Sequence, residues 1–252
     1  MPGIRLPVLP HLFACALLLF GNFAQAAPMS AIDQVQLYAN RATVSLLLLR
    51  GEGFQQAHLN RLQQDIADLQ AATREAVQND AALQPLSEKL VKQLQAGVAY
   101  GPDEDKMPWR YPEDLAQSLR DLLTHASQQP SADPNAELPA KVEYLAVQYL
   151  SRSYIGNFEI AREQPEHYLG QDERRLVPTI DEELARLDSQ DPQLNKLKMR
   201  WKYLRSALLD MNSQSNALTS NSGRAFAPTT VDRHARALSN QWISLSQAAS
   251  TP

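Results

Sequence analysis

Cysteine is nearly absent from this sequence, because the single Cys15 is the only one in the chain. It lies in an apolar run close to the N-terminus, in a stretch that we expect to be removed. A single thiol cannot form an intramolecular disulfide, so the fold must depend on its hydrophobic core alone. Removal of Cys15 would also exclude a cysteine nucleophile.

The motifs of common catalytic sites are also absent. The sequence contains no G-x-S-x-G elbow, no Walker loop and no G-x-G-x-x-G turn. Four histidines outside the N-terminal stretch are isolated from one another, without H-x-x-x-H or H-E-x-x-H spacing. The acidic cluster at 103–105 lacks the spacing of a calcium loop. The sequence therefore predicts a protein that is not an enzyme, with no catalytic residue, no cofactor and no metal.

The net charge and the lack of a second long apolar stretch limit the possible partners. The formal net charge is -4, and this mild acidity argues against nucleic acid as a partner. Beyond the N-terminal run, no apolar stretch is long enough to cross a bilayer. We expect no integral membrane segment once the N-terminus has been processed.

The N-terminus has the layout of a secretory signal peptide. Arg5 precedes an apolar run over 12–20, and the small-residue site Ala24-Gln25-Ala26 follows it. We expect residues 1–26 to be the signal peptide, removed near Ala26/Ala27, and the product to be periplasmic. The alternative is an uncleaved N-terminal anchor. A lipoprotein is not expected, because Ala27 stands where its cysteine would be.

What the sequence does contain is helical periodicity. Apolar residues step by three and four along several segments, and glycine is scarce, with nine in the chain. We predict an all-α, antiparallel bundle of about seven to eight helices in a single domain over 27–252. Capping residues, glycines and prolines place these helices at about 30–50, 55–79, 82–95, 112–127, 140–162, 172–188, from 192 and from 229.

Two features qualify these boundaries. Gly97 is expected to end the third helix, and Pro178 to kink the sixth helix or delay its start. The end of the first helix, "VSLLLLR", is apolar on successive positions, so it has no single apolar face. We expect it to be buried on all sides in the bundle rather than to bind a partner.

The segment "KMPWRYP" is the first candidate for a binding site. It places Trp109, Arg110 and Tyr111 between two prolines in an irregular connection. These residue types are enriched at binding hot spots, and flanking prolines lower the entropy cost of binding. The alternative, which we favour at this point, is that Trp109 folds back over the end of the bundle.

The polar segment before the last helix is the second candidate. We interpret 213–228 as the turn of a helix–loop–helix hairpin, with the last helix returning antiparallel along the bundle. The alternative is a loop that presents Arg224 and Phe226 to a partner.

Export without catalytic motifs favours an interaction protein. We expect it to bind another component of the cell envelope, such as secretion, pilus or receptor machinery. The alternative is a soluble module with a small-molecule pocket between helices, in which Arg152 and Arg200 would bind an anion if they face inward.

The first helix, "AIDQVQLYANRATVSLLLLRGEGF", and the paired helices that close the chain resemble a known architecture. They are similar to the extracytoplasmic helical-bundle sensing modules of bacterial chemoreceptor-type transducers, including those linked to type IV pili. This resemblance implies an extracytoplasmic helical module. The chain lacks the Gln-Arg-Met-type signature of the pilus-linked domains, so the resemblance assigns no site residue.

Overall fold

The structure is a computed structural model, and it describes residues 29–129, 135–187, 190–215 and 219–249. The expected signal peptide and its cleavage point at Ala26/Ala27 lie outside these residues. Within the described ranges the chain forms eight α-helices, two short 3-10 segments and no strand, which confirms the predicted all-α bundle. The α-helices are α1 (Ala31–Gly51), α2 (Gln56–Ala76), α3 (Leu83–Ala99), α4 (Tyr111–Ser127), α5 (Leu138–Tyr154), α6 (Glu173–Arg186), α7 (Pro192–Leu209) and α8 (Pro228–Ala249), and the 3-10 segments are η1 (Glu104–Lys106) and η2 (Tyr168–Gly170).

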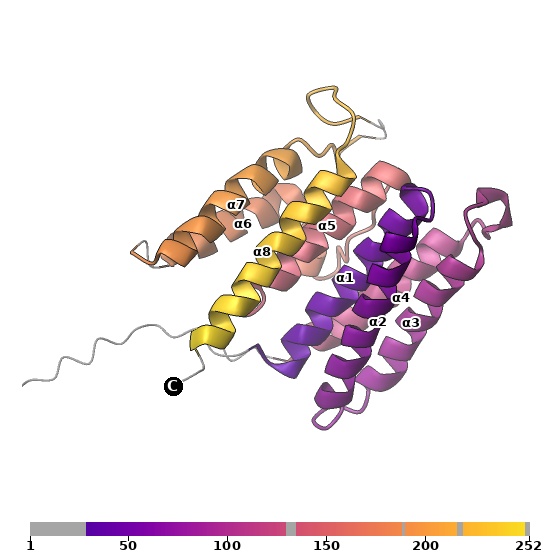
Figure 1. Ribbon diagram of the computed structural model, residues 1–252, viewed down its shortest axis with the longest axis horizontal. Helices are drawn as coiled ribbons and strands as arrows, with labels where there is room; N and C mark the ends of the chain where they lie inside the picture. The colour runs from indigo at the N-terminus through magenta and orange to yellow at the C-terminus, as the bar shows by residue number, and fades with distance from the viewer. Residues whose placement is uncertain (1–28, 130–134, 188–189, 216–218, 250–252) are drawn as a thin grey trace, which may run out of the picture.

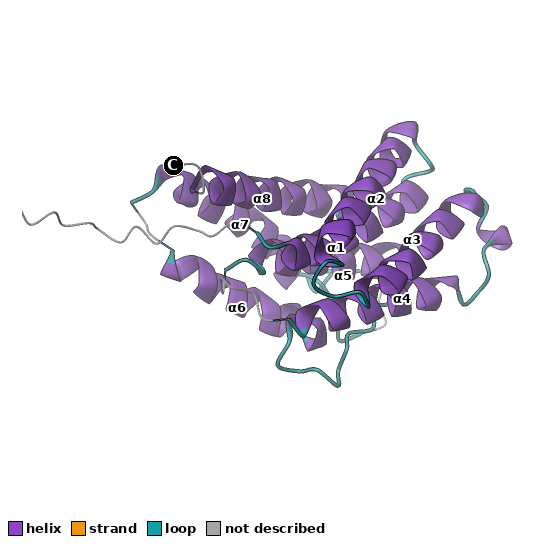
Figure 2. Cartoon of the chain, turned by 90° about the horizontal axis from the view of Figure 1, so that it is seen from below, coloured by secondary structure: helices purple, strands orange, loops and turns teal. Residues whose placement is uncertain are grey.

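The helices pack as two four-helix halves that meet along one seam (Figure 1). In the first half α1 contacts α2, α3 and α4, and α3 contacts both α2 and α4. In the second half α5 contacts α6 and α8, and α7 also contacts α6 and α8. Contacts of α1 with α5 and α8 join the halves, and Figure 2 shows α1 and α5 between the outer helices. One hydrophobic core includes residues from all eight of these helices.

The seam places α1 and α5 at the centre of the molecule. Every residue from 39 to 49 on α1 and from 138 to 152 on α5 is buried. This confirms the expected burial of the "VSLLLLR" end of α1 from Val44 to Leu49, and Arg50 is half-buried. A helix covered on all sides does not need a single apolar stripe, which explains why the "VSLLLLR" end of α1 has none.

Local capping chemistry starts several helices where the sequence predicts. Ser30 and Asp33 form a capping box at the start of α1. Asp191 caps α7 by accepting from the backbone N–H of Gln193 at 2.7 Å, with Pro192 at the first helical position. Pro178 lies inside α6, which continues through it to Arg186.

Two predicted helix ends are wrong. Gly97 does not end α3, which continues to Ala99. The glycine at this position serves packing instead, because a Cβ there would collide with the hydroxyl of Tyr111. The fifth helix ends at Tyr154 rather than near residue 162. Gly156 follows with a φ of +95°, a conformation that favours glycine, and it terminates the helix.

The predicted hairpin at the end of the chain is confirmed. Gln241 on α8 donates to the backbone carbonyl of Gln193 on α7, and Tyr203 on α7 stacks on His234 on α8. These pairings run in opposite directions along the two helices, so α8 is antiparallel to α7 (Figure 1). No helix among the described residues is long and apolar enough to cross a membrane.

Candidate functional site

The connection between α3 and α4 extends outward at one end of the first half (Figure 1). Trp109 lies at its end with 84% of its surface exposed, more than any other large apolar residue described. The expectation that Trp109 folds back over the bundle is therefore wrong. The guanidinium of Arg110 lies over the indole ring, 5.5 Å from its centroid. The two side chains together form an exposed surface, which we call the Trp109/Arg110 pair.

The side chain of Tyr111 is buried and does not belong to this exposed surface, so it cannot contact a partner while the chain is folded. It is only 3% exposed, and its hydroxyl donates to the backbone carbonyl of Gln93 at 2.8 Å. Its ring meets Tyr100 edge to face at 5.2 Å between centroids, and burial raises its pKa. The structure thus corrects the sequence-based assignment of Tyr111: it anchors the start of α4 to α3 and is not a surface contact.

The base of the connection is held from a second side by Arg50 at the end of α1. Its Nη1 donates to the backbone carbonyls of Gly97 at 2.8 Å and Gly101 at 3.0 Å. A cation at this place satisfies carbonyl groups at the C-terminal end of α3 that would otherwise lack partners. Arg50 and Tyr111 therefore fix both ends of the connection, so the Trp109/Arg110 pair is displayed on a supported base.

The second candidate, the segment before α8, also contains one exposed residue and one residue that packs against the bundle. Arg224 is exposed. Phe226 is half-buried and packs edge to face on Tyr149, with 5.3 Å between ring centroids. The Tyr149 hydroxyl also accepts from the backbone N–H of Ala227 at 3.0 Å. Phe226 therefore holds the start of α8 against α5, and only Arg224 is available to a partner.

The turn itself is held by Asp210, at the end of α7. Its carboxylate accepts from the backbone N–H of Ser222 at 2.8 Å and from the Ser222 hydroxyl at 2.7 Å. The hydroxyl bond of Ser222 lowers the pKa of Asp210. These bonds favour the hairpin interpretation of the described part of this segment.

Arg152 and Arg200, the candidate anion ligands of the alternative hypothesis, do not come together. Arg152 is buried, and its guanidinium donates to the backbone carbonyls of Gly156 and Ser215. Arg200 is exposed on α7 and does not face inward. The structure does not unite the two arginines in an interhelical pocket.

Sequence reasoning missed a buried ionic network along the seam. Glu143 on α5 is fully buried and accepts from Arg41 Nε on α1 at 3.0 Å and from the Ser239 hydroxyl on α8 at 2.5 Å. Arg41 also donates to Ser239 and to Asn240 at 2.6 Å each. One side chain from α1 thus connects α5 with α8.

A second group of ion pairs joins α2 to α8. Asp65 on α2 accepts two hydrogen bonds from Arg236 on α8, at 2.7 and 2.6 Å, and one from the Ser45 hydroxyl at 2.5 Å. Arg61 on α2 forms a two-pronged pair with Asp232 on α8, at 2.8 and 2.5 Å. Burial alone lowers the pKa of Arg236, but its bonds to Asp65 and the nearby acids outweigh burial and raise it.

We call the residues of these two groups of ion pairs the seam network. Each of its three arginines is paired with one of its three carboxylates, so the charges balance within the bundle. A signal for it was present in the sequence as polar residues four positions apart, which share one face of a helix. The members are Arg41 and Ser45 on α1, Arg61 and Asp65 on α2, Glu143 on α5, and Asp232, Arg236, Ser239 and Asn240 on α8.

Neither a metal centre nor a similarity to known proteins adds another site. Among the described residues, no group of three or more His, Cys, Asp or Glu side chains could hold a metal ion. Comparisons with known protein families, with curated proteins and with solved structures found no match. The candidate site therefore rests on the chain's own geometry, and the strongest candidate is the Trp109/Arg110 pair.

Proposed function

We propose that this chain is an exported, non-catalytic periplasmic helical protein that binds another component of the cell envelope. Secretion, pilus or receptor machinery is the class of partner that fits an exported helical module. The Trp109/Arg110 pair is the contact that we assign to this partner. The single observation that carries the proposal is the 84% exposure of Trp109 on a connection held at both ends by Arg50 and Tyr111.

The energetics of an indole in water support this assignment. Complete burial of a large apolar side chain stabilises a complex by about 1.5–3 kcal/mol. Trp and Arg are also the side chains most enriched at binding hot spots, where truncation costs at least about 2 kcal/mol. Because the connection is held in place, little chain entropy is lost when it binds. Loss of Trp109 should therefore weaken binding about 30-fold.

The alternative, a small-molecule module, required Arg152 and Arg200 to face an interhelical pocket. Arg152 instead bonds to the backbone carbonyls of Gly156 and Ser215, and Arg200 is exposed on α7. This placement favours a protein partner over an anion-binding pocket.

Site-specific photo-crosslinking in intact cells tests the proposal. A photoreactive amino acid replaces Lys106, which is exposed on the same connection and lies outside the pair, and crosslinked products are compared between chains with Trp109 and with Trp109→Ala. We expect a discrete envelope protein to be crosslinked at position 106 and to be lost with Trp109→Ala. A product that persists at full yield without Trp109, or no product at all, would contradict the proposal.

Two controls separate binding from folding. Tyr111 is left unchanged, because its removal would disturb the α3–α4 packing. Arg74→Ala/Lys92→Ala removes two exposed cations elsewhere, on α2 and α3, and should leave the crosslink intact. Equal loss with this control variant would count against the assigned site.

The export part of the proposal has its own test. N-terminal sequencing of the protein recovered from the periplasmic fraction should begin at Ala27. A membrane-bound chain that begins at Met1 would support the uncleaved anchor instead.

A further inference from the structure

α7 carries a second stripe of residues on an exposed flank beside its buried stripe. Leu197, Trp201, Leu204 and Leu208 face inward and are buried. Lys196, Met199, Arg200 and Tyr203 follow the same spacing of three and four on a neighbouring flank of the helix, and all of them are exposed. Met199 is 50% exposed and Tyr203 is 65% exposed. An outer stripe that combines apolar and basic side chains differs from an ordinary solvated face, which carries polar and charged residues.

The charge on this side has one sign. α7 contains no acidic residue between Pro192 and Leu209. α8 contains a single acid, Asp232, and its carboxylate is paired with Arg61 on the seam side. Among the described residues, none forms an ion pair or hydrogen bond with the charged ends of Lys196, Arg200 or Arg233. These cations are available to an external anion.

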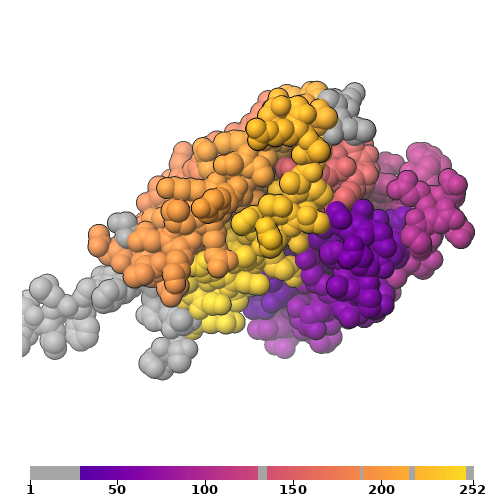
Figure 3. All heavy atoms as spheres, turned by 45° about the horizontal axis from the view of Figure 1, so that its top comes forward, coloured from indigo at the N-terminus to yellow at the C-terminus, as the bar shows by residue number. Residues whose placement is uncertain are grey.

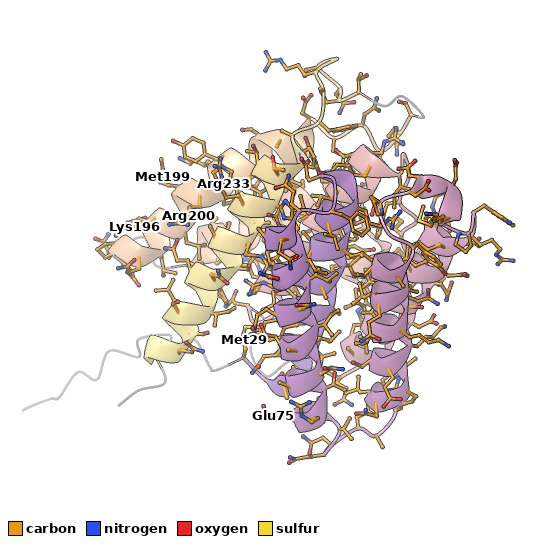
Figure 4. All side chains as sticks on the ribbon, turned by 45° about the vertical axis from the view of Figure 1, so that its right-hand side comes forward. Met29, Glu75, Lys196, Met199, Arg200 and Arg233 are labelled. Atoms are coloured by element: carbon orange, nitrogen blue, oxygen red, sulfur yellow. The ribbon has the colours of Figure 1, made fainter. Side chains whose placement is uncertain are left out.

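The two helices display these side chains together. Tyr203 stacks on His234 of α8, with 6.1 Å between the ring centroids, and Arg233 is the adjacent residue. Figure 3 shows α7 and α8 side by side on one open face, and Figure 4 shows Lys196, Met199, Arg200 and Arg233 on that side, well away from Glu75. We define the α7–α8 basic patch as Lys196, Met199, Arg200, Tyr203 and Arg233.

We propose that the α7–α8 basic patch docks an acidic, amphipathic helical segment of a partner protein. The stripe repeats at positions i, i+3, i+4 and i+7, which is the spacing by which one helix packs along another. The apolar side chains of the incoming helix would cover Met199 and Tyr203, and its carboxylates would pair with Lys196, Arg200 and Arg233. Charge complementarity of this kind steers association and selects partners.

The composition of the patch favours a protein over a lipid surface. Helices that lie in a membrane interface bury a broad apolar face rich in Trp, Phe and Leu. The patch offers one methionine and one tyrosine between cations, which suits contact with a single helix. This site is separate from the Trp109/Arg110 pair, so either can fail without the other.

Binding of a defined probe tests the proposal on the full mature chain. The probe is a synthetic 18-residue helical peptide with leucine on one face and glutamate elsewhere, labelled for fluorescence anisotropy. Its counterpart has glutamine in place of every glutamate. We expect the acidic peptide to bind, the glutamine peptide to bind at least about 10-fold more weakly, and binding to weaken as salt is raised.

A matched pair of charge reversals locates the site. Lys196→Glu/Arg200→Glu should weaken binding of the acidic peptide at least about 10-fold, because each reversal replaces attraction with repulsion. Arg74→Glu/Lys92→Glu changes the net charge by the same amount on α2 and α3 and should leave binding within about two-fold. Circular dichroism checks that both variants fold.

Several results would overturn the proposal. These are no binding of the acidic peptide, equal binding of the glutamine peptide, or equal weakening by both double variants. Binding of the chain to vesicles that contain phosphatidylglycerol is measured as well. Binding to these vesicles that is lost with Lys196→Glu/Arg200→Glu, when the peptide does not bind, would assign the patch to a membrane surface instead.

Discussion

Arg41 on α1 and Glu143 on α5 form an ion pair at the seam, with 3.0 Å between Nε and Oε1 and both side chains buried. Removing two charges from water is costly, and the cost is offset only when the remaining polar atoms are also bonded. Arg41 meets this condition through Ser239 and Asn240 on α8, whereas Glu143 meets it only at Oε1, because its Oε2 is buried without a hydrogen-bond partner. The bonds of Arg41 connect α1 to both α5 and α8, and we infer that they help to align these three helices.

Substitution of one residue of this pair should lower the free energy of unfolding far more than substitution of both. Arg41→Met leaves the Glu143 carboxylate buried without its cation, and we expect it to lower the free energy of unfolding by about 3–5 kcal/mol. Arg41→Met/Glu143→Leu replaces the pair with apolar groups and should recover most of that loss. Urea denaturation of the single and double variants measures the coupling.

The exposed pair of Arg186 and Glu182 on α6 is the matched control. Its atoms are 3.5 Å apart, but both side chains are more than 70% exposed. Arg186→Met should therefore change stability by less than about 0.5 kcal/mol. A similar effect for Arg41→Met would mean that the seam pair contributes no more than a surface pair.

The contact between Gly97 and Tyr111 gives the second prediction. A Cβ at position 97 would overlap the Tyr111 hydroxyl and approach Leu46, so Gly97→Ala should cost about 1–3 kcal/mol. Tyr111→Phe removes the overlapping oxygen, so the same alanine should cost less in that background. Thermal unfolding of the four chains measures this coupling. Strict additivity of the two substitutions would show that the collision does not limit stability.

Helices with one apolar face could be predicted from the sequence, and the polar contacts between helices at the seam could not. α7 and α8 follow their apolar stripes and capping residues, so their starts and their antiparallel pairing were predicted correctly. The seam network escaped prediction because charged residues are expected in solvent, and its pairs join positions up to 199 residues apart. The spacing of four along each helix was visible, but nothing in it identified the partner helix.

The exposure of Trp109 could not be predicted either. It depends on where α4 begins, and α4 begins at Tyr111, whose burial turns the two preceding side chains outward. Residue composition identified the segment as a candidate, but packing decided which of its members are available. The same holds for Phe226, which the sequence grouped with Arg224 and which packs on Tyr149.

The free energies of unfolding of Trp109 and Tyr111 variants should distinguish the roles of these two neighbouring aromatic residues. Trp109→Ala should change the free energy of unfolding by less than about 0.5 kcal/mol, because its side chain is exposed. Tyr111→Ala should lower it by about 3–5 kcal/mol, because it removes a buried ring and its hydrogen bond to Gln93. Urea denaturation of both variants provides the comparison. A large loss with Trp109→Ala would indicate that the indole supports the fold instead of a partner.

Glu173, at the start of α6, gives a prediction about pH. Its side chain is buried, and burial raises its pKa, although the Ser213 hydroxyl donates to Oε1 at 2.6 Å and opposes the shift. A raised pKa in the folded state means that the protonated form is favoured by folding. The contribution to stability is complete below the unfolded pKa of about 4.3 and is lost as the pH rises through the folded value.

Glu173→Gln removes this titration and keeps a group that can accept from Ser213. We therefore expect Glu173→Gln to gain stability relative to the natural chain as the pH rises from about 4 to 7. Urea midpoints of both chains at several pH values measure this difference. If the difference for Glu173→Gln were constant with pH, the buried carboxyl would not titrate with a raised pKa, and its role in α6 would be hydrogen bonding alone.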